Sequence, residues 1–337
     1  MKDFLKQNGE AILFLPLSLF QNDGANSSFR AYRSGEVNFR LATIFDFNDI
    51  DVFSINSLWI MPFDQESKNL LPYFRNENGH WKKYDAKPLF HETDPLSIMR
   101  VDESHRFDKI EPIVIKKESA PRQGVNSCGA NEVFFFGKLE VINTDFVLVS
   151  NKHSGEIFLP AKFIFPLLTS EAFTTENPTP SKWVLMPYQH NGKPLEWSEI
   201  QQYPELMRYL ETNKDILQRR KGLMLHAKLR HGYWWAMLGI GKYSYFPYKV
   251  VWEAYGKTKF NPTIFHGNWQ ANKSLQAFIP VRTFAEAQRI QAELAAPRIE
   301  DFLRSFRMEG TMNWAQPGKL KKLIRYADDA LTDADCK

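Results

Sequence analysis

The residues best suited to binding chemistry lie in one glycine-rich loop, residues 124–131, which is followed by an aromatic run that ends at Phe136. The loop consists almost entirely of small or turn-forming residues, and its two glycines permit backbone conformations with positive φ. Such a loop leaves backbone amides uncovered and can closely approach a phosphate or the edge of a base. Its polar side chains, Asn126, Ser127 and Asn131, are therefore candidate ligand contacts. The alternative is a tight turn that leads into a buried strand.

A second candidate is a basic and aromatic block between residues 208 and 260. It contains eleven Lys or Arg residues against three Asp or Glu residues, whereas the whole chain has a formal net charge of only +4. The block also holds eleven aromatic residues. A basic, aromatic-rich block in an otherwise acidic chain predicts a polyanion as partner, most simply nucleic acid. The candidate contacts in the block are Arg219, Arg220, Lys221, Lys228, Arg230, Trp234 and Lys242.

The cations of this block fall into two groups. Those at 219–221 end a predicted helix, where positive charge also stabilises the helix dipole without any ligand. Lys228, Arg230 and Lys242 have no such explanation and suit contacts with phosphate groups. Trp234 is followed by a second tryptophan, and if the segment is a strand one ring faces the core and the other does not.

Metal-dependent or nucleophilic catalysis has little support in the sequence. The eight histidines are scattered, and the two cysteines, Cys128 and Cys336, lie far apart, so no metal-ligand spacing is present. A series of carboxylates followed by a lysine is shared with magnesium-dependent nucleases, but it lies in a polar, proline-flanked stretch typical of protein surface. Its members are Asp51, Asp64, Glu66 and Lys68.

Composition places the chain among ordinary globular proteins. It has 337 residues, 43% hydrophobic and 24% charged, which suffices for two domains with separate cores. The longest apolar run, residues 11–20, contains a proline and a serine and is too short to span a bilayer. The N-terminus lacks the plan of a signal peptide, and two unrelated cysteines favour a reducing compartment. We therefore expect a cytoplasmic protein with no membrane partner.

Residues 1–62 have the pattern of α/β structure. A helix end is predicted at 5–9, a further helix at 25–33, and strands at 11–15, 41–47 and 55–61. The first strand is fully apolar, and such strands need neighbours on both edges and cover on both faces. The polar stretch 63–112, rich in proline and mixed charges, is predicted to be a linker or insertion.

A second domain is predicted from residue 113 to residue 326. Strands are expected at 146–149, 156–159 and 182–188, and Lys182 at the start of the last of these is a further candidate DNA contact. A helix is predicted from Pro204 to a glycine stop at 222. Thr283 and Glu286 form a capping box that opens a helix to about 296, and a second apolar helical face follows Pro297. Residues 327–337 are predicted to be an acidic tail.

The glycine-rich loop resembles the Gly-x-x-Thr-Gly-x-Asn-x-x-Phe signature that follows the catalytic domain in gamma-class N6-adenine DNA methyltransferases of restriction–modification systems. Ser127-Cys128-Gly129 stands in place of Thr-Gly and is one residue longer, while Asn131 and the run 134–136 fit the rest. Other residues occur in the order of that family's motifs: Leu5, Gly9, Pro16, Phe29, Arg30, Phe53, Leu217, Arg220, Trp234 or Trp235, and the strand from Lys249 to Trp252.

This resemblance implies a two-part fold and a function. Residues 1–62 would be the terminal strands of a Rossmann-like methyltransferase sheet, joined to a mixed α+β DNA target-recognition domain. The expected function is DNA sequence recognition as the C-terminal part of a site-specific adenine-N6 DNA methyltransferase, of type II, type IIG or type I-like. The implied partners are double-stranded DNA and a missing N-terminal catalytic half or partner methyltransferase subunit, and the complete enzyme would use S-adenosylmethionine.

The chain lacks the motifs that this chemistry requires. Adenine methylation needs a glycine-rich turn for S-adenosylmethionine and an Asn/Asp-Pro-Pro-Tyr/Phe motif that holds the flipped base. Asn177-Pro178 and Asn261-Pro262 share only two letters with that motif and are typical of turns. We therefore expect this chain alone to be inactive and to bind no cofactor. The alternatives are a stand-alone, non-catalytic DNA-binding specificity protein and a magnesium-dependent nuclease.

Overall fold

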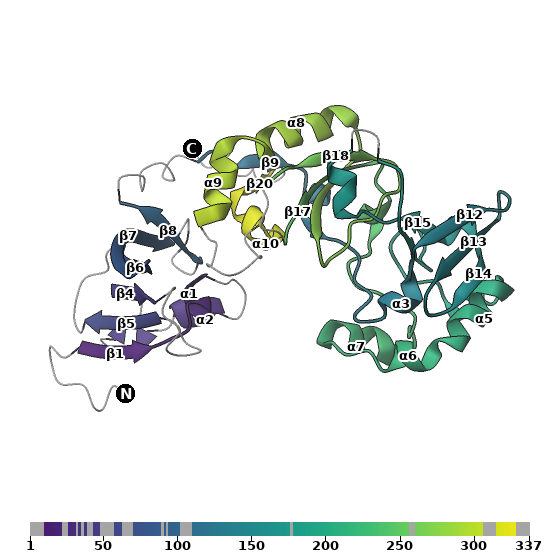
Figure 1. The fold of residues 1–337 in the computed structure, drawn as a ribbon, viewed down its shortest axis with the longest axis horizontal. Helices are drawn as coiled ribbons and strands as arrows, with labels where there is room; N and C mark the ends of the chain where they lie inside the picture. The colour runs from purple at the N-terminus through teal and green to yellow at the C-terminus, as the bar shows by residue number, and fades with distance from the viewer. Residues whose placement is uncertain are drawn as a thin grey trace. The chain divides into compact units, whose positions relative to one another are not determined.

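The computed structural model describes residues 10–21, 26–31, 33–34, 37–38, 43–47, 57–62, 70–88, 91, 94–101, 110–175, 178–255, 260–305 and 315–327. The chain divides into two compact units (Figure 1). One contains residues 1–112 and 296–324, and the other contains residues 113–295 and 325–337. The segment 296–324, predicted as part of the second domain, thus belongs to the first unit.

The first unit is built on one mixed sheet. Its strands are β1 (Glu10–Phe14), β2 (Arg33–Ser34), β3 (Val37–Asn38), β4 (Thr43–Asp46), β5 (Ser57–Pro62), β6 (Leu71–Glu77), β7 (His80–Pro88) and β8 (Leu96–Arg100). Six of them form a sheet of order β1-β5-β4-β6-β7-β8, in which only β4 and β6 are parallel neighbours. The helices are α1 (Ser18–Gln21), α2 (Asn26–Ala31), α9 (Pro297–Ser305) and α10 (Pro317–Leu320), and η8 (Lys321–Leu323) is a 3₁₀ turn.

The first strand leaves one edge of the described sheet open. A strand of its composition needs neighbours on both edges, and in the described part of the chain β1 lies at the end of the sheet and pairs with β5 alone, as expected if its natural neighbour is supplied from elsewhere. Alternate side chains of β1 face solvent, and Ile12 and Phe14 are 60% and 50% exposed. This strand therefore presents both an apolar face and a sheet edge.

The stretch 63–112, predicted to be a linker or insertion, contributes three strands to the sheet. β6 and β7 form a hairpin around Asn78-Gly79, whose φ angles of 52° and 80° suit a two-residue hairpin turn. Residues 80–83 of β7 are exposed, which gives this stretch the polar composition of a loop. The pair Asn78-Gly79 is a typical hairpin signal in the sequence, but the polar composition of the whole stretch favoured a loop.

The core of the first unit lies against this sheet. Trp59 and Tyr73 are almost completely buried, together with apolar side chains of β1, β4 and α1. α9 packs on β8, and its predicted apolar face is confirmed by the burial of Ile299, Phe302 and Leu303.

The second unit combines three small antiparallel sheets with short helices. Its strands are β9 (Ile113–Ile115), β10 (Arg122–Gln123), β11 (Phe135–Phe136), β12 (Lys138–Val141), β13 (Phe146–Asn151), β14 (Gly155–Pro160), β15 (Ile164–Pro166), β16 (Trp183–Leu185), β17 (Tyr248–Glu253), β18 (Thr263–His266) and β19 (Gln276–Val281). The sheet orders are β10-β19-β17-β18, β11-β16-β15 and β12-β13-β14, and β9 pairs with β20 (Ile324–Tyr326). The mixed α+β class is therefore confirmed.

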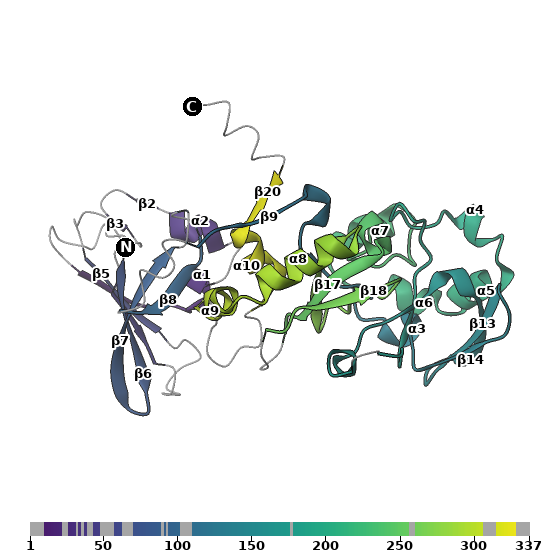
Figure 2. The ribbon, with the colours of Figure 1, turned by 90° about the horizontal axis from the view of Figure 1, so that it is seen from above.

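Helices of the second unit border these sheets. They are α3 (Asn131–Phe134), α4 (Trp197–Ile200), α5 (Pro204–Thr212), α6 (Lys214–Gln218), α7 (Leu223–Arg230) and α8 (Phe284–Leu294), with 3₁₀ turns η4 (Lys117–Ser119), η5 (Ala161–Phe163), η6 (Ser170–Phe173) and η7 (Lys242–Tyr245). α8 lies along β17 and β18 (Figure 2). The Thr283 hydroxyl accepts the Glu286 amide at 3.3 Å, which confirms the predicted helix start.

The single helix predicted from Pro204 to residue 222 is interrupted. α5 ends before Asn213, whose buried side chain donates to the carbonyl of Tyr209 at 2.9 Å. That bond competes with regular helix pairing, and α6 resumes at Lys214. Among the described helices, none is long and apolar enough to cross a membrane.

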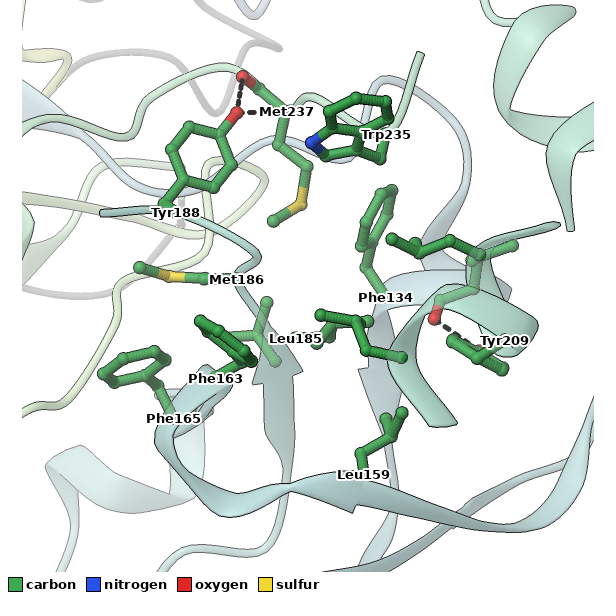
Figure 3. Close-up of a cluster of buried hydrophobic side chains, with 14 of the residues drawn as sticks. Phe134, Leu159, Phe163, Phe165, Leu185, Met186, Tyr188, Tyr209, Trp235 and Met237 are labelled. Carbon is green, nitrogen blue, oxygen red and sulfur yellow. Dashed lines mark hydrogen bonds between the residues drawn. The ribbon is translucent and has the colours of Figure 1, made fainter. Parts of the chain in front are cut away.

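The large core of the second unit joins the sheets β11-β16-β15 and β12-β13-β14 to α5 (Figure 3). Phe134, Leu159 and Leu185 pack with aromatic side chains from several strands. The Tyr188 hydroxyl donates to the carbonyl of Met237 at 2.8 Å and accepts its amide at 2.7 Å, so the segment after α7 is fixed to this core.

Candidate nucleic-acid interface

The glycine-rich loop is anchored by backbone hydrogen bonds on two sides. The Val125 amide donates to the carbonyl of Ala271 at 2.7 Å, and the Asn126 amide donates to the carbonyl of Leu238 at 2.9 Å. The Leu238 amide returns a bond to the Asn126 carbonyl at 3.0 Å. The protein itself therefore uses amides that the sequence predicts to be free for a ligand.

The two loop glycines have different roles. A Cβ atom on Gly124 would lie 2.1 Å from the backbone oxygen of Ala271, so glycine is required there because two backbone segments of the protein approach closely. Gly129 has a φ of 99° and open space around its Cα, so glycine is required there for conformation. Both needs are those of a tight turn.

The candidate polar side chains of the loop are placed unequally. Ser127 is buried and its hydroxyl donates to Asn131 Oδ1. Asn126 is half-buried and its Oδ1 accepts the amide of Cys128 at 2.9 Å. Asn131 is exposed at the start of α3, a helical turn that precedes the expected strand. Of the three, Asn131 is the one presented to solvent.

Arg220 is a structural clamp and not a surface cation. Its side chain is buried, and its guanidinium donates to the carbonyls of Leu217 at 2.9 Å, Ser127 at 2.9 Å and Trp234 at 2.7 Å. It also lies 5.5 Å from the ring centroid of Phe134. Arg220 thereby ties α6, the glycine-rich loop and the segment after α7 together, so its predicted contact with DNA is replaced by this role.

Three predicted cations are exposed around α6 and α7. Arg219 and Lys221 flank the clamp, and Arg230 ends α7. Among the described residues, none of the three forms an ion pair with a carboxylate, so their charge is available to an external anion. Lys228 is half-buried on α7, and burial lowers the pKa of its amine.

A hollow of about 580 Å³ lies beside Arg230, which lines it. Trp234, half-buried, lines the hollow, and its ring packs 5.3 Å from that of Trp197 and 5.2 Å from that of Trp235. The Lys214 amine lies 5.4 Å from the Trp234 ring centroid. The lining residues are Gln218, Leu223, His226, Leu229, Arg230, Gly232 and Trp234. An arginine, an aromatic ring and apolar side chains thus line one hollow.

Lys182 and Lys242 do not belong to this group of residues. Lys182 is exposed directly before β16. Lys242 is exposed in η7, where its charge helps to lower the pKa of the Glu118 carboxyl, although the hydrogen bond from Arg282 to that carboxyl is the main cause. Lys242 therefore lies beside the Glu118–Arg282 ion pair, whose Nε and Oε1 atoms are 2.8 Å apart.

Leu223 and Met224 at the start of α7 were not among the residues predicted from the sequence. Both are apolar but strongly exposed, at 89% and 73%. Their position directly after the basic run 219–221 and Gly222 could have indicated an exposed helix start. The sequence did not predict α7 as a separate helix.

A metal site has no counterpart in the part of the chain that the structure describes, where no three His, Cys, Asp or Glu side chains come together to hold an ion. The nuclease-like residues Asp51, Asp64, Glu66 and Lys68 lie outside the described residues.

The fold resembles part of a restriction–modification enzyme. One similar solved structure is that of the Type IIL restriction-modification enzyme MmeI in complex with DNA, with a TM-score of 0.50 and 12% sequence identity. The similarity covers 91% of this chain but only 38% of the MmeI chain. At this identity the likeness concerns the fold. No protein-family model and no curated protein matches the sequence.

Proposed function

We propose that the chain recognises DNA as the target-recognition part of a site-specific adenine-N6 DNA methyltransferase of a restriction–modification system. The observation that carries this proposal is a hollow of the second unit that is lined by exposed Arg230 and half-buried Trp234, with exposed Arg219 and Lys221 in the chain shortly before α7. Exposed cations suit phosphate groups, and an aromatic ring beside Arg230 suits the faces of bases. The fold likeness to a restriction–modification enzyme solved with DNA supports the same function.

Phosphate and base contacts would come from different residues. The exposed cations would fix the register of the protein on the duplex without reading sequence. Sequence would be read by polar side chains that can reach base edges, of which Asn131, Gln218 and His226 are exposed. Arg220 would act indirectly, because it holds the loop that presents Asn131 against the segment that carries Trp234.

In this proposal the first unit supplies the terminal strands of a Rossmann-like catalytic sheet. The exposed apolar side chains of β1 and its place at the end of the described sheet support pairing with further strands. Those strands would belong to a catalytic half, either an N-terminal region of the same polypeptide or a partner subunit. That half would bind S-adenosylmethionine and hold the target adenine.

The proposal is tested by DNA binding of the chain as it stands. Fluorescence anisotropy with a labelled random-sequence duplex should show binding whose affinity falls by orders of magnitude between about 50 and 200 mM salt. A set of duplexes enriched from a randomised pool should then bind more tightly than the unselected pool. Absence of binding at low salt, both alone and with a catalytic half, would overturn the proposal.

A further inference from the structure

The start of α7 carries an apolar pair with no cover. Among the described residues, Leu223 at 89% and Met224 at 73% are the most exposed large apolar side chains. They are neighbours in sequence, so together they form one small apolar projection. Single exposed apolar residues need no explanation, but this pair also adjoins a hollow, which Leu223 lines, and is therefore a candidate contact surface.

Local structure fixes this pair in its exposed position. Gly222 has a φ of 136°, a conformation that other residues rarely adopt, and it turns the chain directly before the helix. The His226 amide donates to the carbonyl of Gly222 at 2.9 Å, and Leu225 is fully buried. Because Leu225 anchors the first turn of α7, the two preceding side chains are held outward on a defined element.

The charges around the pair identify what it contacts. Arg219 and Lys221 precede it, and Arg230 ends the same helix, all exposed. Leu223 also lines the hollow that contains Trp234 and Arg230. An apolar projection that follows two exposed cations, on a helix that ends in a third, is complementary to a polyanion with an apolar interior. A DNA duplex has that composition, with phosphates outside and stacked bases inside.

We infer that Leu223 and Met224 insert as a wedge between stacked base pairs of bound DNA. The inference rests on the proposed DNA-binding function and adds deformation of the duplex to it. Inserted Leu or Met side chains unstack a base step and kink the helix, while adjacent cations hold the phosphates on either side. The hollow beside Leu223 offers space for the displaced base edge next to the Trp234 ring.

The test compares two duplexes that differ only in how easily they unstack. One is fully paired, and the other carries a central two-base mismatch, which lowers the energy needed for insertion. The chain should bind the mismatched duplex about tenfold more tightly, which corresponds to about 1.4 kcal/mol. The double variant Leu223→Ser, Met224→Ser should lose this preference. Both positions are on the surface, so folding should be unaffected.

A matched control separates this effect from a general loss of apolar surface. Val141 is 70% exposed on β12 of the same unit, and Val141→Ser should keep the full preference for the mismatched duplex. If the double variant keeps that preference as well, the wedge is refuted even though DNA binding stands. If the double variant keeps the preference for the mismatched duplex but no longer self-associates in analytical ultracentrifugation, the pair is a contact between copies of the chain and the inference is overturned. If the wild-type chain binds neither duplex, the proposed function fails first.

Discussion

At the scale of single residues, Arg220 joins three segments that are distant in sequence. Its three donated hydrogen bonds go to the carbonyls of Leu217, Ser127 and Trp234. Replacing Arg220 by Met should lower the free energy of unfolding by about 3 kcal/mol, because three hydrogen bonds from a charged donor are lost. Chemical denaturation measures this loss.

The neighbouring arginine supplies the control. Arg219 is exposed, so Arg219→Met should change the free energy of unfolding by less than about 0.5 kcal/mol. Equal effects of the two substitutions would contradict the clamp. Composition could indicate a basic block here, but not which of two adjacent arginines points inward, because that depends on carbonyls contributed by the loop and by residue 234.

Lys249 predicts an unusual dependence of stability on pH. It is fully buried on β17, its amine donates to the carbonyl of Phe246 at 3.2 Å, and burial lowers its pKa to about 7. The unfolded chain has the ordinary lysine value of about 10.4 and therefore binds more protons between the two values. Stability should accordingly rise with pH through that window.

Lys249→Met tests this pH effect. The substitution removes the cost of burying an amine, so the free energy of unfolding should increase by at least about 1 kcal/mol near pH 7, and the gain should shrink towards pH 10. Denaturant titrations at several pH values measure both. A variant that is less stable than the natural chain at pH 7 would show instead that the Lys249 amine is needed.

At the scale of elements, the glycine-rich loop should respond differently at its two glycines. Gly124→Ala forces a Cβ atom against the backbone of Ala271 and should cost at least about 3 kcal/mol. Gly129→Ala meets no atom but strains a positive φ and should cost about 1 kcal/mol. Thermal unfolding compares the two variants, and a larger loss for Gly129→Ala would mean that close packing does not fix the loop.

Elements with a strong local signal were predictable from the sequence. The capping box at Thr283 and the apolar stripe after Pro297 rest on contacts within a few residues, and the structure confirms both. The hairpin at Asn78-Gly79 had a signal too, but its charged outward face concealed it. The break at Asn213 had no local sequence signal. The hydrogen bond from the Asn213 side chain to the Tyr209 carbonyl depends on how the helix packs in the folded protein.

The candidate site was predictable as a region but not as a surface. The sequence indicates the basic and aromatic block, and the structure brings Arg230 and Trp234 to one hollow within it. It places Lys242 beside Glu118 and buries Ser127, because those positions follow from pairing between segments far apart in the chain. Charge density along a sequence does not determine which side chains share a face.

At the scale of the whole molecule, methylation should require a component besides this chain. Isothermal titration calorimetry should detect no binding of S-adenosylmethionine at micromolar concentrations, and the chain alone should transfer no methyl group to DNA. Addition of a catalytic half should create both activities. Cofactor binding by the chain alone would refute the proposal that a separate catalytic half binds S-adenosylmethionine. DNA binding that does not lead to methylation with any catalytic half would favour a stand-alone specificity protein.

The central claim is that the surface around α6 and α7 contacts the phosphates of DNA. Its most direct test is the salt dependence of duplex binding, measured by fluorescence anisotropy, for the triple variant Arg219→Gln, Lys221→Gln, Arg230→Gln. Each phosphate contact contributes about 0.9 to the slope of log affinity against log salt, so the triple variant should bind more weakly and lose about 3 from the slope. The control Lys138→Gln, Lys152→Gln, Lys193→Gln removes three exposed cations elsewhere on the second unit and should leave the slope nearly unchanged. An unchanged slope in the first variant, or an equal loss in both, would contradict the claim.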